Sequence, residues 1–323
     1  MKKKRALYIL FLLSLVILES PGFTQPSFPV LVFDEKINKQ GQSDIENLLP
    51  RRFRSTAFCL TGFFNGLRFK ALRISGSGQF TQKQLTQIVL SILQQQKIPP
   101  QDFVLVDLRQ EPHLFVEGKP FTLFSPYFSG HQDNTSNQSL EEEQYLKKRL
   151  EAEDTFLVHT VSKKDPKGNL GTTRLTSLSS KTILTEHEIA KDLGISYRRL
   201  AVQDHQPPSD NVVEDFITLV QNLPPQAWVH FHCRGGSGRT STFMIMYDIL
   251  KNGKKLSLSE IMNRQVALGG KNLDNITSKS PFLKEGAQKR QRFIHHFYRY
   301  ATASDGLGHQ SWRQWLQNNP IPD

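Results

Sequence analysis

The chain has 323 residues, with 41 lysines and arginines against 30 aspartates and glutamates, and a formal net charge of +11. Its length suits one large domain, or one domain with a smaller second unit. Two cysteines, Cys59 and Cys233, are too few for a disulfide framework, so the disulfide-stapled class is excluded. The basic charge alone would suit nucleic acid, but no nucleic-acid-binding motif accompanies it, and we expect no such partner.

Residues 1–24 have the pattern of a secretory signal peptide. Four basic residues follow Met1, and the apolar run Ala6–Leu18 comes next. That run is too short to span a bilayer comfortably. We expect cleavage near Thr24, export to the periplasm or the medium, and no stable membrane insertion afterwards; an uncleaved anchor is the alternative. Cleavage would remove four basic residues and one acidic residue, leaving a net charge of +8.

The next stretch runs from a lead-in to the start of the core. Residues 25–50 are rich in polar residues and proline, and they predict an irregular lead-in. Residues 51–111 open the predicted core. Apolar residues at helical spacing indicate a helix over 81–96. The β-branched and apolar run 103–108 indicates a buried strand.

Residues 112–182 combine several strand patterns with polar, loop-like stretches, and they predict a smaller, mostly β insertion packed against the core. A capping-box pattern predicts a helix over 139–152, and strands are expected at 155–161 and 172–178. Lys163 and its basic neighbours suit either a solvated rim or additional phosphate contacts.

Residues 183–323 return to the core. Strands alternate with helices from Phe103 onward, which predicts an α/β fold with ligands at the carboxyl ends of the strands. Asp204 and Cys233 both lie at such ends. The helices predicted in this part cover residues 185–193, 211–223, 257–268 and 282–300.

The segment Val229–Thr240 reads as a strand, a glycine-rich loop and the start of a helix. Backbone N–H groups and the helix dipole converge in such a loop and form an anion cradle. A thiol held there, Cys233, should ionise below its ordinary pKa of about 8.5 and act as a nucleophile. Arg239 offers a planar fork for two phosphoryl oxygens. The alternative is a buried cysteine beside an ordinary turn. The predicted phosphate-binding loop residues are Arg234, Gly235, Gly236, Ser237 and Gly238.

Four neighbours complete the predicted chemistry. Thr240 is placed to bond the sulfur as a leaving group, or merely to start the helix. We expect His232 to orient the loop. Asp204, followed by His205, is the candidate proton donor and later the base for water, with a turn cap as its alternative role.

The histidines give only a weak metal signal. His230 and His232 share one strand face, and His295 and His296 lie on a helix. Neither pair has a carboxylate or cysteine at ligand spacing. We therefore expect neither a metal nor another cofactor.

The pattern His-Cys-x5-Arg-Thr resembles the signature of the cysteine-dependent protein tyrosine phosphatase (PTP) superfamily. Most of the chain also resembles the bacterial PTP-like inositol polyphosphate phosphatases, the cysteine phytases. This resemblance implies a PTP-like core with a mainly parallel central sheet flanked by helices. It also implies hydrolysis of phosphate monoesters of phytate and lower inositol polyphosphates through a cysteinyl-phosphate. The segments that carry it include Leu72–Phe80, Val106–Glu111, Tyr197–His205 and Arg264–Gly270.

The resemblance further implies substrate contacts outside the loop. It places Arg54 at the mouth of the site and Asp107 at a strand end facing the pocket, although Asp107 and Arg109 could simply satisfy each other. Arg290 aligns with a basic contact of the family, and Lys284 is the nearest candidate for a second. Arg234 stands where the family often has an acidic residue. A cation there would add positive potential at the rim, as in members of the PTP superfamily that accept inositol lipids.

Other functions remain open from the sequence. An exported phosphotyrosine phosphatase and a phosphoinositide phosphatase are the enzymatic alternatives, and an inactive phosphate-binding module is the alternative from another class. Cys59 is expected to be a plain buried residue, although an oxidising compartment would allow it to pair with Cys233. The sequence gives no oligomeric state.

Overall fold

The computed structural model describes residues 30–34, 44–58, 69–124, 135–161, 171, 173–179, 182–278 and 280–321. The predicted signal peptide at residues 1–24, Cys59 and Lys163 lie outside these ranges. Within them, none of the helices combines the length and the apolar character needed to cross a membrane.

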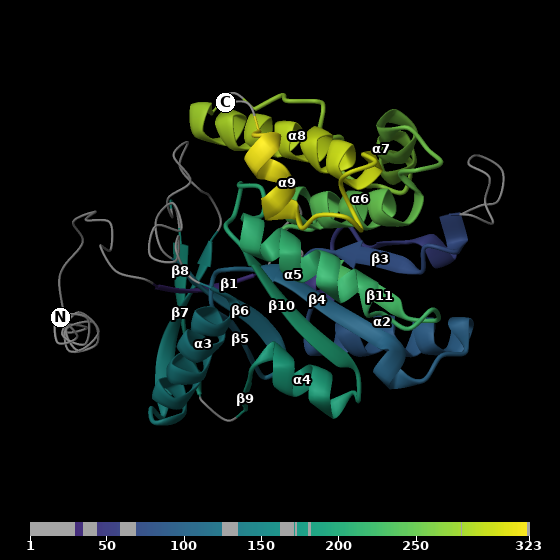
Figure 1. The fold of residues 1–323 in the computed structure, drawn as a ribbon. Coiled ribbons are helices and arrows are strands. Elements are labelled where there is room, and N and C mark those ends of the chain that lie inside the picture. The colour runs from purple at the N-terminus through teal and green to yellow at the C-terminus, as the bar shows by residue number, and fades with distance from the viewer. Residues whose placement is uncertain are drawn as a thin grey trace.

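A five-stranded sheet forms the core that carries the site (Figure 1). Its strand order is β10-β4-β11-β3-β2. The strands from β10 to β3 run parallel, and β2 pairs antiparallel with β3. This arrangement confirms the predicted α/β core with a mainly parallel sheet. The strands are β2 (Arg54–Ser55), β3 (Ile74–Ser77), β4 (Phe103–Arg109), β10 (Ser196–Val202) and β11 (Trp228–His232).

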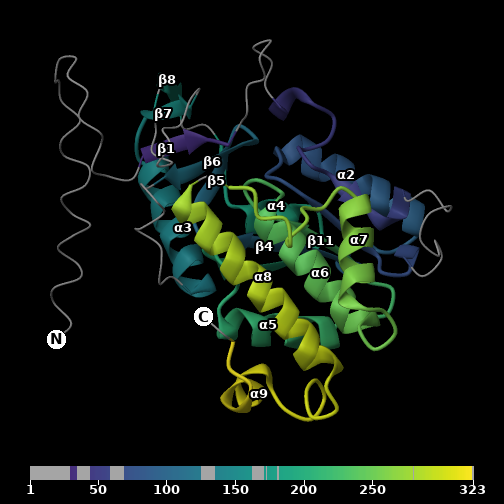
Figure 2. The same cartoon turned by 90° about the horizontal axis from the view of Figure 1, so that it is seen from above.

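Both faces of this sheet are covered because its strands are apolar on both sides. In β4, Val104, Val106 and Leu108 join one hydrophobic core, whereas Phe103 and Leu105 join the other. Helices α5 to α9 lie on the first side and helices α2 and α4 on the second (Figures 1 and 2). The helices are α2 (Gln82–Gln96), α4 (Glu186–Asp192), α5 (Asp210–Gln221), α6 (Gly238–Asn252), α7 (Leu258–Ala267), α8 (Pro281–Thr302) and α9 (Trp312–Asn318). Short 3-10 turns cover Asp44–Glu46, Thr56–Phe58 and Pro100–Asp102.

A second sheet has the order β8-β7-β1-β6-β5-β9. Helix α3 (Ser136–Glu151) packs against it through Leu150, which shares a small core with Phe156 and Val158. Most of its strands come from residues 112–182. The strands are β1 (Val30–Phe33), β5 (His113–Val116), β6 (Lys119–Phe124), β7 (Thr155–Val161), β8 (Thr173–Ser179) and β9 (Ile183–Leu184).

Two local predictions were wrong. The lead-in predicted as irregular contains β1, which pairs antiparallel with β6 and parallel with β7. Four apolar residues become a strand there because partners distant in sequence supply their hydrogen bonds. Helix α3 begins at Ser136 rather than Ser139, because Thr135 and Gln138 form the capping box. Ser139 instead donates its hydroxyl to the Gln110 carbonyl at 2.8 Å.

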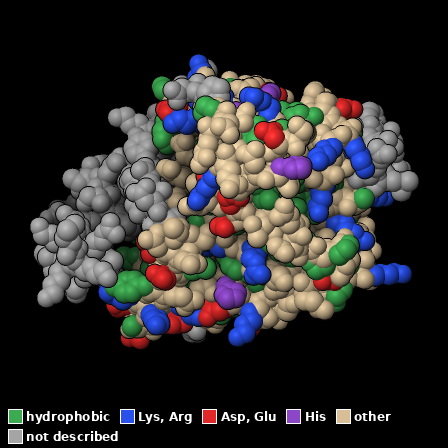
Figure 3. Space-filling view, viewed as in Figure 1, with side chains coloured by type: hydrophobic (Ala, Val, Ile, Leu, Met, Phe, Trp, Pro, Cys, Tyr) green, Lys and Arg blue, Asp and Glu red, His purple; other side chains and the backbone are tan. Residues whose placement is uncertain are grey.

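The charged side chains on the face seen in Figure 1 are mixed. Lysines and arginines are spread over this face with acidic side chains between them (Figure 3). The net positive charge of the chain therefore does not form a single basic stripe on this side.

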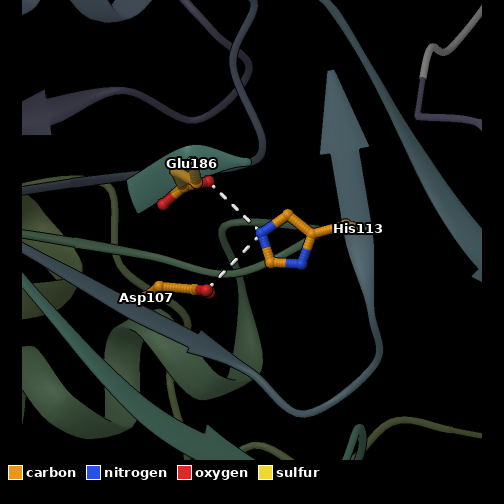
Figure 4. Close-up of side chains that lie close together, drawn as sticks. All are labelled: Asp107, His113 and Glu186. Carbon is orange, nitrogen blue, oxygen red and sulfur yellow. Dashed lines mark hydrogen bonds and ion pairs between the residues drawn. The ribbon is translucent and has the colours of Figure 1, made fainter. Parts of the chain in front are cut away.

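A buried charged cluster links the two sheets. His113 of β5 places Nε2 3.4 Å from Asp107 of β4 and 3.3 Å from Glu186 of α4 (Figure 4). Its Nδ1 lies 3.1 Å from both the Glu111 carbonyl and a Glu143 carboxylate oxygen. Both ring nitrogens therefore face acceptors, which favours the imidazolium. Burial lowers the pKa of His113, but the Asp107 and Glu143 carboxylates outweigh it and the pKa is raised.

Replacing His113 with glutamine should destabilise the fold in a pH-dependent way. Removal of one partner from a buried charged cluster costs about 3 kcal/mol. Because the folded pKa is raised, this stabilisation is fully present below the unfolded pKa of about 6.5 and is lost as the pH rises through the folded value. Urea unfolding of both proteins at a series of pH values measures the difference, which should shrink with rising pH.

The matched control for this prediction is His295→Gln. His295 is exposed and pairs with Asp274 at 2.9 Å on the surface, so its loss should change the free energy of unfolding by less than about 1 kcal/mol. A His113→Gln deficit that stays constant across the pH range would contradict the imidazolium assignment.

Candidate active site

The thiol of Cys233 lies directly after β11, where the chain turns into the loop that precedes α6. Cys233 is 3% exposed. Its Sγ accepts the Gly236 N–H at 3.2 Å and the Thr240 hydroxyl at 3.1 Å. Burial raises the pKa of this thiol, but the charge of Arg239 and the Thr240 hydrogen bond outweigh burial, and the pKa lies below its ordinary value. The geometry favours a thiolate.

The loop is compressed against the end of β3. Gly236 has a φ of +67°, a conformation that favours glycine. A Cβ at Gly236 would lie 2.3 Å from the Gly78 nitrogen and 2.6 Å from the Ser77 carbonyl carbon. The glycine is therefore required both for the backbone conformation and for the close approach of the two segments.

Arg239 opens α6 and is held by Glu111. Its two terminal nitrogens donate to the two Glu111 carboxylate oxygens at 2.7 and 2.9 Å, and Nη1 also donates to the Val202 carbonyl at 3.0 Å. Both side chains are buried. Burial lowers the pKa of Arg239, but the Asp204 and Glu111 carboxylates outweigh burial and raise it, so the guanidinium is charged. No role was expected for Glu111 from the sequence, although its place just after a strand end was the available signal.

Asp204 lies beside the arginine, as a proton donor to a bound phosphate ester would require. Its Oδ1 is 3.3 Å from Arg239 Nη2, and its side chain is 23% exposed. The His205 backbone N–H donates to Oδ1 at 3.0 Å, and the His205 ring nitrogen Nε2 is 3.4 Å from Oδ2. Burial raises the pKa of Asp204, but the charges of Arg239 and His205 outweigh burial and the pKa is lowered.

Helix α8 supports the loop that carries Asp204. The ring of His205 meets Phe282 edge-on at 6.2 Å. A Cβ at Gly286 would lie 2.3 Å from the His205 carbonyl oxygen. His205 itself has a φ of +66°, which few residues other than glycine adopt. The two elements therefore fit closely where the acid is held.

Three arginines contact the outer side of the loop. Arg54 is 4% exposed and donates to the Gly236 carbonyl at 2.8 Å and to the Ser241 hydroxyl at 3.1 Å. Burial lowers its pKa to about 10. Its guanidinium is therefore buried against the loop backbone, and the expected contact of Arg54 with substrate at the mouth of the site stays a prediction. Arg51 and Arg52 donate to the carbonyls of Arg234 and Gly235.

Two other predicted contacts also have buried partners of their own. Asp107 is fully buried, and its oxygens accept the Arg109 N–H and the Tyr197 hydroxyl, each at 2.9 Å. It therefore satisfies neighbouring groups and does not face a substrate pocket. Arg234 donates to Asp34 at 2.6 Å, so a carboxylate offsets the positive potential that was expected from Arg234 at the rim.

Arg290 is the outer cation that lies against the loop. A Cβ at Gly238 would lie 2.6 Å from its Nη1, and its Nη2 donates to the Gln206 carbonyl at 3.1 Å. Its buried Nε has no hydrogen-bond partner among the described residues. Lys284 is exposed and lies six residues earlier on α8, which at 100° per residue places it on a different face of the helix. The structure does not bring Lys284 to the loop.

Lys271 is a cation near the site that the sequence analysis missed. Its backbone N–H donates to the Ser241 hydroxyl at 2.8 Å. Burial lowers the pKa of Lys271, and the charges of Arg290 and Arg52 lower it further. Lys271 is therefore close enough to both arginines to be repelled by them, which an anion nearby would relieve.

Among the described residues, one group of three side chains lies close enough together to hold a metal ion, but its members already form hydrogen bonds and ion pairs. Asp107, His113 and Glu186 bring three potential ligand atoms within 4.8 Å of one another. However, Arg199 lies 3.0 Å from Asp107, and both nitrogens of His113 face hydrogen-bond acceptors. His232 bonds Glu186 at 2.6 Å, whereas His230 lies between the Ser75 and Ser77 hydroxyls. These contacts describe an ion-pair network rather than a set of free ligands.

Comparisons with known proteins match both the loop and the fold. The family model of the PTP-like phytases, whose description reads "Inositol hexakisphosphate", matches residues 106–251. "Uncharacterized protein AvrBs1.1" of Xanthomonas campestris is 37% identical over 93 residues, which cover 28% of this chain and 89% of that protein. "Effector protein hopD2" of Pseudomonas syringae is 29% identical over 214 residues, 65% of this chain and 45% of that protein.

Two solved structures share the fold over nearly the whole chain. The PTP-like myo-inositol phosphatase from Mitsuokella multacida, in complex with myo-inositol-(1,3,4,5)-tetrakisphosphate, has a TM-score of 0.78 and 27% identity, and covers 95% of this chain and 50% of that one. A PTP-like phytase from Bdellovibrio bacteriovorus has a TM-score of 0.66 and 29% identity. The match covers 93% of this chain and 98% of that one.

The lengths of these proteins differ. This chain spans about half of the Mitsuokella protein and less than half of the Pseudomonas effector. It spans nearly all of the Bdellovibrio phytase. The matched family segment contains the loop with Cys233 and Arg239 as well as Asp204. The chain therefore belongs to the family of PTP-like inositol phosphatases, the PTP-like phytases.

Proposed function

We propose that the protein hydrolyses phosphate monoesters of myo-inositol hexakisphosphate and lower inositol polyphosphates through a cysteinyl-phosphate. The observation that carries this proposal is the Cys233 sulfur, which accepts two hydrogen bonds in a loop closed by Arg239. The names of the Mitsuokella and Bdellovibrio relatives support the substrate class. No cofactor takes part in the proposed reaction.

In the proposed first step, the Cys233 thiolate attacks phosphorus and the bond from phosphorus to the ester oxygen breaks. Loop N–H groups and Arg239 stabilise the charge on the phosphoryl oxygens. Asp204 gives its proton to the departing alkoxide. In the second step, Asp204 takes a proton from water, the water oxygen attacks phosphorus, and the thiolate leaves. Thr240 stabilises that thiolate through its hydroxyl, 3.1 Å from the sulfur.

The surrounding cations favour a substrate with several phosphates. Arg290 lies against the loop with an unpartnered Nε, and burial together with the charges of Arg290 and Arg52 lowers the pKa of nearby Lys271. A single phosphate bound at Cys233 would leave these charges uncompensated. A neighbouring phosphate on the same inositol ring would offset them.

We also propose that the protein acts after export, in the periplasm or outside the cell. The charged start and the short apolar run of residues 1–24 support this location. A substrate carrying many negative charges should then be attracted over a distance that depends on ionic strength, with a screening length of about 8 Å at physiological salt.

Cys233→Ser should lower phosphate release from phytate by about a thousandfold or more, because a serine hydroxyl remains protonated and is a much weaker nucleophile. Phosphate release should be measured with phytate, phosphatidylinositol phosphates and a phosphotyrosine peptide at equal concentration. Wild-type preference for the peptide would favour a tyrosine phosphatase. Tight phytate binding by the wild type without phosphate release would instead favour a binding module.

Asp204→Asn should lower kcat on phytate by about a hundredfold or more, because the alkoxide then leaves without a proton. The free enzyme's Asp204 has a lowered pKa, so its protonated fraction falls as the pH rises and activity should be highest at acidic pH. The variant should lose that decline. With p-nitrophenyl phosphate, whose leaving group needs no proton, the deficit should be much smaller. An equal deficit on both substrates would argue against the acid role.

Arg290→Met should raise KM for phytate about tenfold, as expected when a charge-assisted hydrogen bond is lost. Lys284→Met is the matched control on the same helix and should change KM by less than twofold. Initial rates should be measured with phytate and with an inositol monophosphate, because the monophosphate fills only the position of the reacting phosphate and leaves the neighbouring position empty. Equal effects of Arg290→Met on both substrates would mean that Arg290 serves the reacting phosphate rather than a second one.

A further inference from the structure

Three consecutive carbonyls of the catalytic loop accept hydrogen bonds from one short segment. Arg51 donates to the Arg234 carbonyl, Arg52 to the Gly235 carbonyl at 2.6 Å, and Arg54 to the Gly236 carbonyl at 2.8 Å. These contacts join parts of the chain that are more than 180 residues apart. Carbonyl oxygens that accept from guanidinium groups make charge-assisted hydrogen bonds, which are stronger than neutral ones.

Because the peptide group is planar, a hydrogen bond to its carbonyl on the outer side of the loop also fixes the direction of its N–H on the inner side. In a trans peptide, the carbonyl of one residue and the N–H of the next point in opposite directions. A carbonyl held on the outer side therefore directs the following N–H inward. The carbonyl of Gly235 and the N–H of Gly236 belong to one such peptide group. Arg52 holds its oxygen at 2.6 Å, and its N–H lies 3.2 Å from the Cys233 sulfur.

This peptide group needs external support because glycines flank it. Gly235 and Gly236 both lack a side chain, and Gly236 has a φ of +67°. Glycine has more backbone freedom than any other residue, so the peptide could rotate at small steric cost. An outward hydrogen bond from a cation opposes that rotation and keeps the amide aimed at the sulfur.

Among the three arginines, Arg52 gives the cleanest test of this support. Arg51 and Arg54 are largely buried, and their charges interact directly with the Cys233 thiolate. Arg52 is exposed and reaches the loop through the Gly235 carbonyl. Its removal therefore leaves no buried cavity.

We propose that Arg52 is a positioning residue that holds the Gly235 carbonyl and so aims the Gly236 N–H at the sulfur of Cys233. Arg51 and Arg54 hold the neighbouring peptide groups in the same way. The proposal concerns the site to which the proposed function is assigned, but its central measurement needs no substrate. Failure of one can therefore be distinguished from failure of the other.

The test is the pH dependence of alkylation of Cys233 by iodoacetamide, followed by mass spectrometry of the peptide that contains Cys233. The thiolate is the reactive form, so the midpoint of the rate profile reports its pKa. Arg52→Met should move that midpoint upward by about one pH unit, as expected for the loss of one hydrogen bond to the anion. On phytate, kcat should fall about tenfold, with a smaller change in KM.

Arg73→Met is a closely matched control. Arg73 has a φ of +52°, against +54° for Arg52, and it donates to a backbone carbonyl, that of Gln226, at 3.3 Å. That carbonyl lies two residues before β11, at the opposite end of this strand from the loop. Arg73→Met should leave the alkylation midpoint unchanged. Arg52→Lys, which keeps a donor and a charge, should restore part of the shift.

Each result decides the proposal. An unchanged alkylation midpoint in Arg52→Met would overturn it, and a rise in KM alone would make Arg52 a substrate contact instead. An equal shift in Arg73→Met would also overturn it, because the effect would then be general. If Arg52→Met melts below the assay temperature, Arg52→Ala, which also removes the donor, gives the same readout. A shifted midpoint in a protein without phytate activity would support the positioning role and reject only the function.

Discussion

The bidentate pair between Arg239 and Glu111 is the contact on which the site's geometry depends. An unpaired guanidinium could take several rotamers, but two parallel hydrogen bonds at 2.7 and 2.9 Å fix its plane. The arginine also loses its solvent in this position, so removal of the carboxylate would leave a buried charge without a partner. Glu111 therefore makes it possible to keep a guanidinium beside Cys233 in one orientation before substrate arrives.

This pair is one link in a series of buried ion pairs that connects the two sheets. Arg109 bonds Glu111 at 3.1 Å and Asp34 at 2.7 Å, and Asp34 also accepts from Arg234 at 2.6 Å. Asp34 directly follows β1 of the second sheet. It contacts the loop residue Arg234 directly, and it is linked to Arg239 through Arg109 and Glu111. Each carboxylate in the series is shared by two arginines, which lowers the pKa of Asp34 and of Glu111. Packing of the second sheet and order in the loop are therefore coupled.

The sequence allowed the proposed nucleophile, its arginine and the proposed acid to be named because each has a local pattern. Cys233 and Arg239 share one strand-loop-helix segment, and Asp204 follows a recognisable strand. The supporting residues have no such pattern. Glu111 and Asp34 read as ordinary charges until the fold places them beside arginines up to 200 residues away. The same limit hid the contacts of Arg54 with the loop, since a basic cluster looks the same in sequence whether it meets substrate or backbone carbonyls.

In the proposed reaction, Arg239 would also couple substrate binding to the protonation of Asp204. In the free site, Asp204 Oδ1 lies 3.3 Å from Arg239 and its pKa is lowered chiefly by that charge, against burial. A phosphate on the same guanidinium supplies negative charge of its own, so it competes with the carboxylate and cancels its stabilisation. Under this proposal the pKa of Asp204 rises when phosphate binds, and the carboxyl takes up the proton that the departing alkoxide needs. In that mechanism the cation that orients the phosphate also causes the acid to take up its proton, so binding and catalysis need no separate switch between them.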